Sequence, residues 1–547
     1  MRMWGWMSRL GGRTGDFISG LPKHFDARDW RRKLILLRFI RRFRRVIQNM
    51  FSPKTVQNPS SSALPWPFKL CILVLVLQFF PVNSHAQVDD YLHMHSEQGS
   101  LYNARATGMG NAYSTIGYDY TAVRFNPSTL AVADSLSFLF GINYNVYPNT
   151  AEYRKTNSLM TTTNTAFTQF GMTVPLSSES RRTVAALGFA ESKDLSRNLR
   201  FSGYNSTTST LINDLTNFGS AVVADLGLNY PLYDSSGAIL RTETILGSDL
   251  QQDGNVDETG SVLTLSGGIA TETAHNVFFG ASVNYNIGTW KSNREFVETD
   301  LNNVYDAGTS TVPGNPATSD FQSFYYHESR DVLMRGFEVR LGVLYKFFDF
   351  ISIGGAYKIA LPHTISETRS IEGTSRFASG LRAVTEPYQN NTYTVIPAPE
   401  MTAGAAVNLW ILTVTAEATF IDYTQITYKD GPSKLETSLY NKKAAEVYAR
   451  VLNLNGGAEF RIPFTNLSTR AGFMYRPTAY KSDTRDYDRK YLSAGIGYVS
   501  EGWLSFDLAY GYGWWNEIYR GNGETFAGVI QQIQVHDLIS TIRLTLP

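Results

Sequence analysis

The chain has 547 residues, of which 43% are hydrophobic, 18% are charged and 13% are aromatic. After residue 90 it contains no apolar run near the roughly 20 residues of a transmembrane helix, which excludes a helical membrane protein. Its one cysteine, Cys71, lies in a targeting segment, so the mature protein has neither disulfides nor cysteine-ligated metals. Many aromatic residues, many glycines and few charges favour a large β-structure with an apolar outer surface.

Residues 50–86 have the pattern of a secretory signal peptide. Leu70–Phe80 is an apolar run, and a short polar segment follows it, with cleavage predicted after Ala86. Residues 1–49 form a basic N-terminal extension with two interpretations. It is either an amphipathic surface-binding helix or a gene-model artefact, with translation starting at Met50.

Charge separates this N-terminal region from the rest of the chain. Residues 1–86 carry a net charge of +12, so the near-neutral total conceals a mature chain with a net charge of −11. An acidic protein is a poor match for a polyanion. We therefore predict no nucleic-acid partner.

From Ser135 onward, apolar and polar residues alternate with a period of two, which predicts strands with one apolar face. Leu504, Phe506 and Leu508, for example, alternate with Ser505 and Asp507. The predicted strands are 135–147, 165–176, 183–191, 261–271, 276–290, 333–347, 350–366, 399–409, 411–428, 444–461, 466–477, 489–500, 503–518 and 536–546.

The connections between these strands alternate between short and long, as in outer-membrane barrels. Apolar rows would face lipid, because an Arg or Lys near the bilayer midplane costs roughly 2–4 kcal/mol. A sheet in a bilayer must also close, because no water is present to satisfy a free edge. The predicted fold is therefore all-β: a transmembrane antiparallel β-barrel of about 14 strands over residues 135–547.

Charged residues in the polar rows would line the lumen. Their side chains either guide a ligand carboxylate, for which Arg is the natural partner, or pair with one another and anchor a plug. The lumen charges are Glu338, Arg340, Glu417, Arg470 and Asp507.

Residues 87–134 precede the first strand and are rich in small residues and turns. Fourteen strands enclose a lumen wider than side chains can fill, so an open barrel would leak. We predict that this segment is a small N-terminal hatch (plug) inside the lumen; the alternative is an ordinary periplasmic tail. Residues suited to turns and tight packing are Gly108, Met109, Gly110, Asn126 and Pro127.

Two motifs in this segment resemble the hatch of the FadL/TodX family. They are Asn103–Ala112 (NARATGMGNA) and Phe125–Leu130 (FNPSTL), where Ser128 replaces the alanine of the family pattern. Two later segments, Ile396–Asp430 and Tyr491–Tyr512, resemble strands of Bacteroidota-type members. The similarity extends over most of the chain that follows the signal peptide.

This resemblance implies an outer-membrane channel for the passive uptake of hydrophobic compounds such as long-chain fatty acids or aromatic hydrocarbons. Extracellular loops would capture the ligand, a site next to the hatch would bind it, and an opening near the third strand would release it laterally. We expect contacts with outer-membrane lipid, insertion by the barrel-assembly machinery and a monomeric state. The third predicted strand, 183–191, is the shortest and could leave such an opening.

Two long loops contain candidate ligand-binding residues. In loop 192–260, an apolar stripe at i, i+1, i+4 and i+7 predicts a short amphipathic helix, and loop 291–332 adds two further apolar residues. Exposed apolar surface often marks a binding site; alternatively, the helices only pack on each other over the barrel mouth. The candidates are Leu211, Ile212, Leu215, Phe218, Phe296 and Leu301.

The sequence contains no phosphate-binding glycine loop, no zinc-protease motif and no serine-hydrolase motif. We therefore predict neither an enzyme, nor a cofactor, nor a metal site. The alternative function is a FadL-like barrel that acts as a protein-interaction or shuttle component of a secretion system. A general polar porin is a weaker alternative, because a plug would obstruct it.

Overall fold

The computed structural model describes residues 103–176, 182–207, 209–217, 220–348, 350–430, 434–500, 502–519 and 528–546. The predicted signal peptide, the basic extension, the first part of the predicted hatch and Phe218 lie outside these ranges. None of the described helices has the length and apolar character needed to span a membrane.

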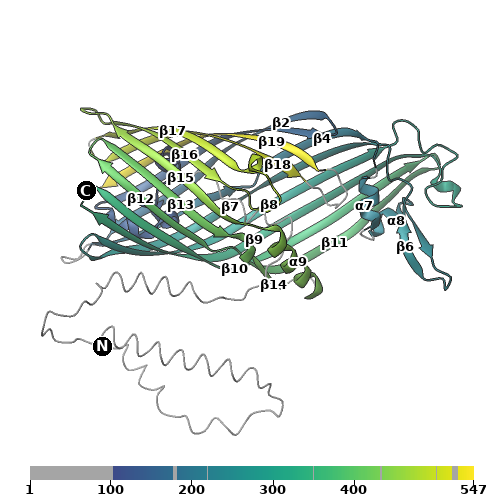
Figure 1. Cartoon of the computed structure of the whole chain (residues 1–547), viewed down its shortest axis with the longest axis horizontal. Coiled ribbons are helices and arrows are strands. Elements are labelled where there is room, and N and C mark those ends of the chain that lie inside the picture. The colour runs from purple at the N-terminus through teal and green to yellow at the C-terminus, as the bar shows by residue number, and fades with distance from the viewer. Residues whose placement is uncertain are drawn as a thin grey trace, which may run out of the picture. The chain divides into compact units, whose positions relative to one another are not determined.

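The described strands form one antiparallel sheet (Figure 1) and a separate hairpin of β5 (Tyr230–Tyr233) and β6 (Ile239–Glu243). The sheet contains β1 (Leu136–Tyr153), β2 (Thr156–Pro175), β3 (Thr183–Asp194), β4 (Arg197–Asn205), β7 (Leu250–Ala274), β8 (Val277–Thr299), β9 (Phe321–Phe347), β10 (Ile351–Phe377), β11 (Gly380–Ile396), β12 (Glu400–Leu409), β13 (Leu412–Asp422), β14 (Thr427–Asp430), β15 (Arg450–Arg461), β16 (Leu467–Arg476), β17 (Arg489–Ser500), β18 (Leu504–Tyr519) and β19 (Val529–Leu546).

The sheet closes on itself, because β1 pairs with β19 from Leu136↔Leu546 to Glu152↔Ile530. Three positions in the barrel wall are each shared by two strands that lie end to end. β3 and β4 both pair with β7, β11 and β12 both pair with β10, and β13 and β14 together form the next position. The described strands therefore occupy fourteen positions, which confirms the predicted count.

The wall has an apolar outer face and a polar inner face, as β8 illustrates. Val283 points outward and is 51% exposed, whereas its neighbours Ser282 and Asn284 point inward and are buried. This distribution is the reverse of that in a soluble protein, and it suits a wall with lipid outside and a polar lumen inside. Further along β8 the outward residues become polar, at Lys291 and Asn293, so the apolar band ends there.

Four strands extend well beyond this band. β7, β8, β9 and β10 have 25, 23, 27 and 27 residues, so the segments 291–332 and 367–398, predicted as loops, are partly strand. Phe296 accordingly lies in β8 and not in a loop. The prediction was wrong because alternation of apolar and polar residues marks a strand only where one face meets lipid.

Short helices occur in the hatch and in the connections between strands. In the hatch, which we define as residues 103–134, these are α5 (Ala104–Gly108), α6 (Ala122–Phe125) and the 3₁₀ helix η1 (Pro127–Val132). The other 3₁₀ helices are η2 (Pro316–Thr318), η3 (Tyr423–Gln425) and η4 (Arg485–Tyr487). The helix α9 (Lys434–Val447) includes residues 444–447, which we had predicted as strand.

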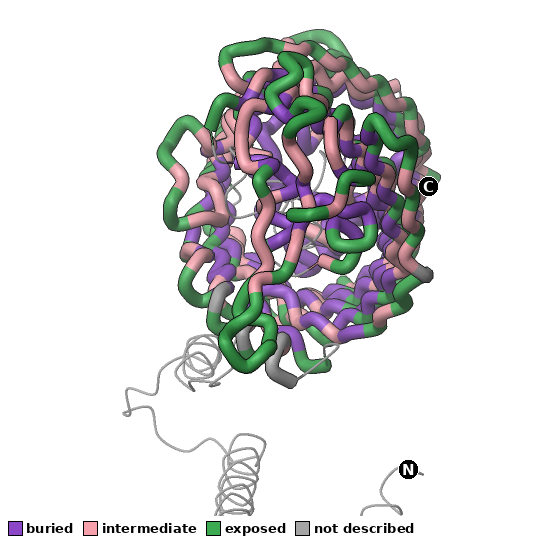
Figure 2. The backbone as a smooth tube through the Cα atoms, turned by 90° about the vertical axis from the view of Figure 1, so that its right-hand side faces the viewer, coloured by how far each residue is buried: buried purple, intermediate pink, exposed green. Residues whose placement is uncertain are grey.

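The end of the barrel opposite the short turns is covered by α7 (Leu211–Asn217) and α8 (Ala221–Asp225). Figure 2 looks into this end and shows buried segments within the ring of strands. Leu211, Ile212 and Leu215 of α7 are buried with Val222 of α8 and Phe324 of the wall. The predicted helix in this loop is therefore present, and its apolar stripe packs against the barrel.

Candidate functional site

The hatch lies inside the barrel and packs against a belt of glycines. Ten strands each contribute one of these glycines, and a Cβ atom built on any of them would approach a hatch atom to 3.3 Å or less. The hatch therefore packs directly against the backbone of the strands around most of the barrel's circumference. The belt consists of Gly171, Gly188, Gly268, Gly280, Gly342, Gly354, Gly404, Gly457, Gly472 and Gly495.

Met109 and Gly110 bring the hatch backbone itself against the belt. A Cβ on Gly457 of β15 would lie 2.2 Å from the Met109 carbonyl oxygen, and one on Gly472 of β16 would lie 2.0 Å from the Gly110 nitrogen. Gly110 has a φ of 60°, a left-handed conformation that glycine adopts without strain. The turn and the barrel glycines together allow this close approach, which also involves Gly108.

Asn126 and Pro127 hold the other side of the hatch. The Asn126 amide donates to the carbonyl of Ser114, at 2.8 Å, and to that of Val343 in β9, at 3.0 Å. Pro127 begins η1 and lies against Gly280 of β8. Because one side chain joins two hatch segments to the wall, replacing Asn126 would loosen both.

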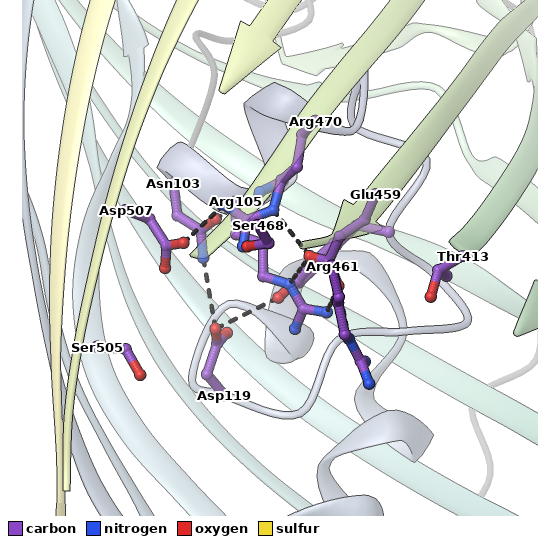
Figure 3. A network of polar contacts seen from close by, with 12 residues as sticks. Asn103, Arg105, Asp119, Thr413, Glu459, Arg461, Ser468, Arg470, Ser505 and Asp507 are labelled. Carbon is purple, nitrogen blue, oxygen red and sulfur yellow. Dashed lines mark hydrogen bonds and ion pairs between the residues drawn. The ribbon is translucent and has the colours of Figure 1, made fainter. Parts of the chain in front are cut away.

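Ion pairs fix the hatch where α5 meets the wall (Figure 3). Arg105 donates two hydrogen bonds to Glu459 of β15, at 3.0 and 3.2 Å. Arg470 of β16 donates to the same carboxylate at 2.8 Å and to Asp507 of β18 at 2.6 Å. Burial lowers the pKa of Arg105, but Glu459, Tyr118 and Tyr113 together outweigh it and hold that pKa above its ordinary value, so the guanidinium stays charged.

The predicted lumen charges thus divide into two groups. Arg470 and Asp507 belong to the ion-pair network, and Glu417 of β13 accepts a hydrogen bond from the Ser114 backbone at 2.9 Å, so these three anchor the hatch. Glu338 and Arg340, both on β9, line a cavity beside the hatch, and Glu417 lines it as well.

This cavity has a volume of about 140 Å³ and is bounded on the hatch side by Asn111, Arg124 and Phe125. One wall is charged. Lys358 of β10 forms ion pairs with Glu400 of β12 and with Glu338, the latter at 3.9 Å, and Arg340 lies 3.5 Å from Glu400. Lys358 and Arg340 therefore pair with carboxylates of the cavity.

Another part of the cavity lining is apolar. Val262, Met334 and Tyr423 line it and belong to a buried cluster that also contains Trp290 and Ile365. The cavity therefore has one charged side and one apolar side, an arrangement that suits a compound with a polar end and an apolar body.

The hydrogen-bonded ladder of the barrel wall is broken near the cavity. β2 pairs with β3 only over Gln169–Pro175, and no described residue forms a ladder with the same edge of β2 over Thr156–Thr168. We call this break the wall gap. Ser192 and Lys193, where the β3 ladder bulges, line the cavity. The predicted end of the third strand at residue 191 was wrong, because β3 continues to Asp194 and β4 extends its position.

The structure does not gather the candidate ligand-binding residues at one open surface. Leu211, Ile212 and Leu215 are buried beneath the loops, and Phe296 packs beside them. Leu301 is 67% exposed on a turn.

The cavity residues Lys358 and Glu400 were missed by the sequence analysis. Both lie in predicted strands, and their positions in the polar rows were the available signal. Only the register between β10 and β12, which pairs Lys358 with Glu400, shows that they meet. Among the described residues, no group of three or more His, Cys, Asp or Glu side chains could hold a metal ion.

A closed sheet with an apolar exterior, a charged interior and an internal hatch defines a plugged transmembrane β-barrel. Among solved structures, a Pseudomonas aeruginosa FadL homologue matches with a TM-score of 0.50 at 14% identity, over 82% of this chain and 99% of that chain. That likeness shows a shared fold and confirms the predicted FadL/TodX-type architecture.

Other similar structures have lower scores. The Pseudomonas putida toluene transporter TodX has a TM-score of 0.49 at 14% identity, and the Ralstonia pickettii toluene transporter TbuX has 0.45 at 15% identity. Each alignment covers 82% of this chain and 99% of the other. No family model and no curated protein matches the sequence.

Proposed function

We propose that this protein is an outer-membrane channel for the passive uptake of hydrophobic compounds, with the hatch as its gate. The cavity between the hatch and the wall gap carries this proposal, because apolar side chains line it next to charged ones. By their names, TodX and TbuX transport toluene, a hydrophobic compound. Loops over the mouth would capture the ligand, and the wall gap would release it into the membrane.

The two-sided cavity favours an amphiphile such as a long-chain fatty acid over a hydrocarbon. A carboxylate would lie towards Arg340 and Lys358, and the apolar chain would lie along Met334 and Tyr423. A hydrocarbon has no group that could interact with these cations. The mature chain, cleaved after Ala86, would be inserted by the barrel-assembly machinery and function as a monomer.

Uptake of radiolabelled oleate and toluene into proteoliposomes tests the proposal. The protein should accelerate oleate uptake, and equal uptake with and without the protein would refute it. Met334→Asp, which places a charge on the apolar wall, should slow oleate uptake at least tenfold. Arg335→Asp is the matched control, because Arg335 is the next residue on β9 and is exposed on the outer face.

Hatch gating requires a second measurement. Deleting residues 99–130 should convert a closed barrel into a steadily conducting pore in planar bilayers. Baseline conductance from a correctly folded deletion variant would show that the hatch does not block the lumen.

A further inference from the structure

Most of one edge of the long strand β11 has no described partner. β11 pairs with β10 from Phe377↔Gly380 to His363↔Val395. On its other side it pairs only with β14, through Thr394, Val395 and Ile396. No described residue pairs with that side of β11 before Thr394, although its backbone N–H and C=O groups alternate there as in any strand.

Two features delimit a short open window on this edge. At one end the ladder with β10 shifts register between Glu386 and Gln389, where Pro387 lies, and at the other end β14 ends at Asp430, opposite Thr394. We call Tyr388–Thr392 the edge segment. Its length matches the five or six residues of an average strand.

The edge segment is open to solvent on both faces. Tyr388 is 74% exposed, and Gln389, Asn390 and Thr392 are also exposed. Alternate side chains of a strand point to opposite faces, so neither face is covered here.

The chemistry of the segment also differs from that of a protected edge. Natural edges usually carry Lys, Pro or a bulge that prevents pairing with another strand. Tyr388–Thr392 contains no charged residue and has three amide side chains, each of which can donate and accept hydrogen bonds. Pro387 and the register shift protect only the adjoining stretch.

The segment faces water and not lipid. It pairs with Thr368 and Ser366 of β10, which follow Leu361, the last residue of the apolar row on that strand. A lipid chain cannot supply the alternating donors and acceptors that this edge presents, whereas an extended polypeptide supplies them at the same spacing.

A second copy of this chain is a poor occupant. Two copies in one membrane are related by an axis along the membrane normal, and barrel strands tilt by about 35–45° from that normal. The two edges would then cross at roughly 70–90° and could not form a ladder.

We propose that the edge segment binds an extended, uncharged segment of another protein, rich in Asn, Gln or Thr, as an added β-strand. The added strand would pair with β11 over Tyr388–Thr392. This inference rests on the strand pairing alone and does not depend on the transport function.

Binding of a short peptide to the full-length barrel in nanodiscs tests the proposal. The probe is a fluorescent peptide with the sequence of Tyr388–Thr394, because amide-rich strands pair with their own sequence. It should bind saturably, and a scrambled peptide should bind at least tenfold more weakly. Asn390→Lys combined with Thr392→Lys should weaken binding at least tenfold, and so should Asn390→Pro, which blocks the edge without adding charge.

The matched control is Thr289→Lys combined with Asn293→Lys on β8. Both residues are exposed, but β8 has partners on both sides. Infrared spectra of the bound, isotope-labelled peptide should show β-sheet pairing. The proposal is overturned if the scrambled peptide binds equally well, if the folded edge variants bind like the wild type, or if the bound peptide is not a strand.

Discussion

Two adjacent glycines in β15 provide a sharp test of how the hatch is held. Gly457 points inward, and a Cβ there would lie 2.2 Å from the carbonyl oxygen of Met109. Gly456 points outward, and the nearest atom to its Cβ would be the Thr415 carbonyl oxygen at 3.9 Å. Gly457→Ala and Gly456→Ala are therefore the same substitution on the two faces of one strand.

The size of the effect follows from the distance. An ordinary contact begins at 3.4 Å, so the hatch must move by about 1.2 Å to accommodate the new methyl group at Gly457. Overpacking of this kind costs about 1–3 kcal/mol. Since each 1.4 kcal/mol is a factor of ten, the population with a displaced hatch should rise about five- to 150-fold.

Single-channel recording in planar bilayers measures this population as open probability. The open probability of Gly457→Ala should rise by the same factor as the displaced-hatch population, and that of Gly456→Ala should equal the wild-type value. Heat-dependent mobility on gels verifies that both variants fold. Equal open probabilities for the two folded variants would refute the reasoning, because the glycine belt would then not determine hatch position.

Three further predictions follow from other contacts. Arg105→Gln breaks the buried hatch–barrel ion pair, a loss of about 3–5 kcal/mol, and should raise open probability even when the barrel remains folded. Ile496→Arg on the lipid face should destabilise the barrel by about 2–4 kcal/mol in vesicle refolding, whereas Asn293→Arg above the apolar band should change stability by less than about 0.5 kcal/mol. Glu298→Ala removes the carboxylate that accepts from two α7 backbone N–H groups at 2.7 and 3.1 Å, so proteolysis of that loop should accelerate about five- to 30-fold, with exposed Glu295→Ala as control.

The strands were the most predictable part of the fold. Alternation along β13 and β18 is a local property, because each lipid-facing residue must be apolar whatever strand lies beside it. The short helix α7 was predictable for the same reason, since its stripe of Leu211, Ile212 and Leu215 follows helical spacing. Both signals lie within a dozen residues of chain.

The upper parts of β7–β10 were not predictable in this way. Above the apolar band, residues such as Lys291 and Asn293 face water, and the alternation that marks a strand disappears. Pairing with neighbouring strands, which no local pattern records, maintains the extended backbone there. The break between β3 and β4 escaped prediction for the same reason.

The sequence by itself determined the barrel, the number of strand positions and the presence of a hatch segment before the first strand, because lipid and a wide lumen impose those requirements locally. Only the tertiary structure decided what the hatch touches. Met109 meets Gly457, and Lys358 meets Glu400, through the register of strands distant in sequence. Register is settled by closure of the whole sheet, so the glycine belt, the two-sided cavity and the open edge of β11 become visible only once the barrel is closed.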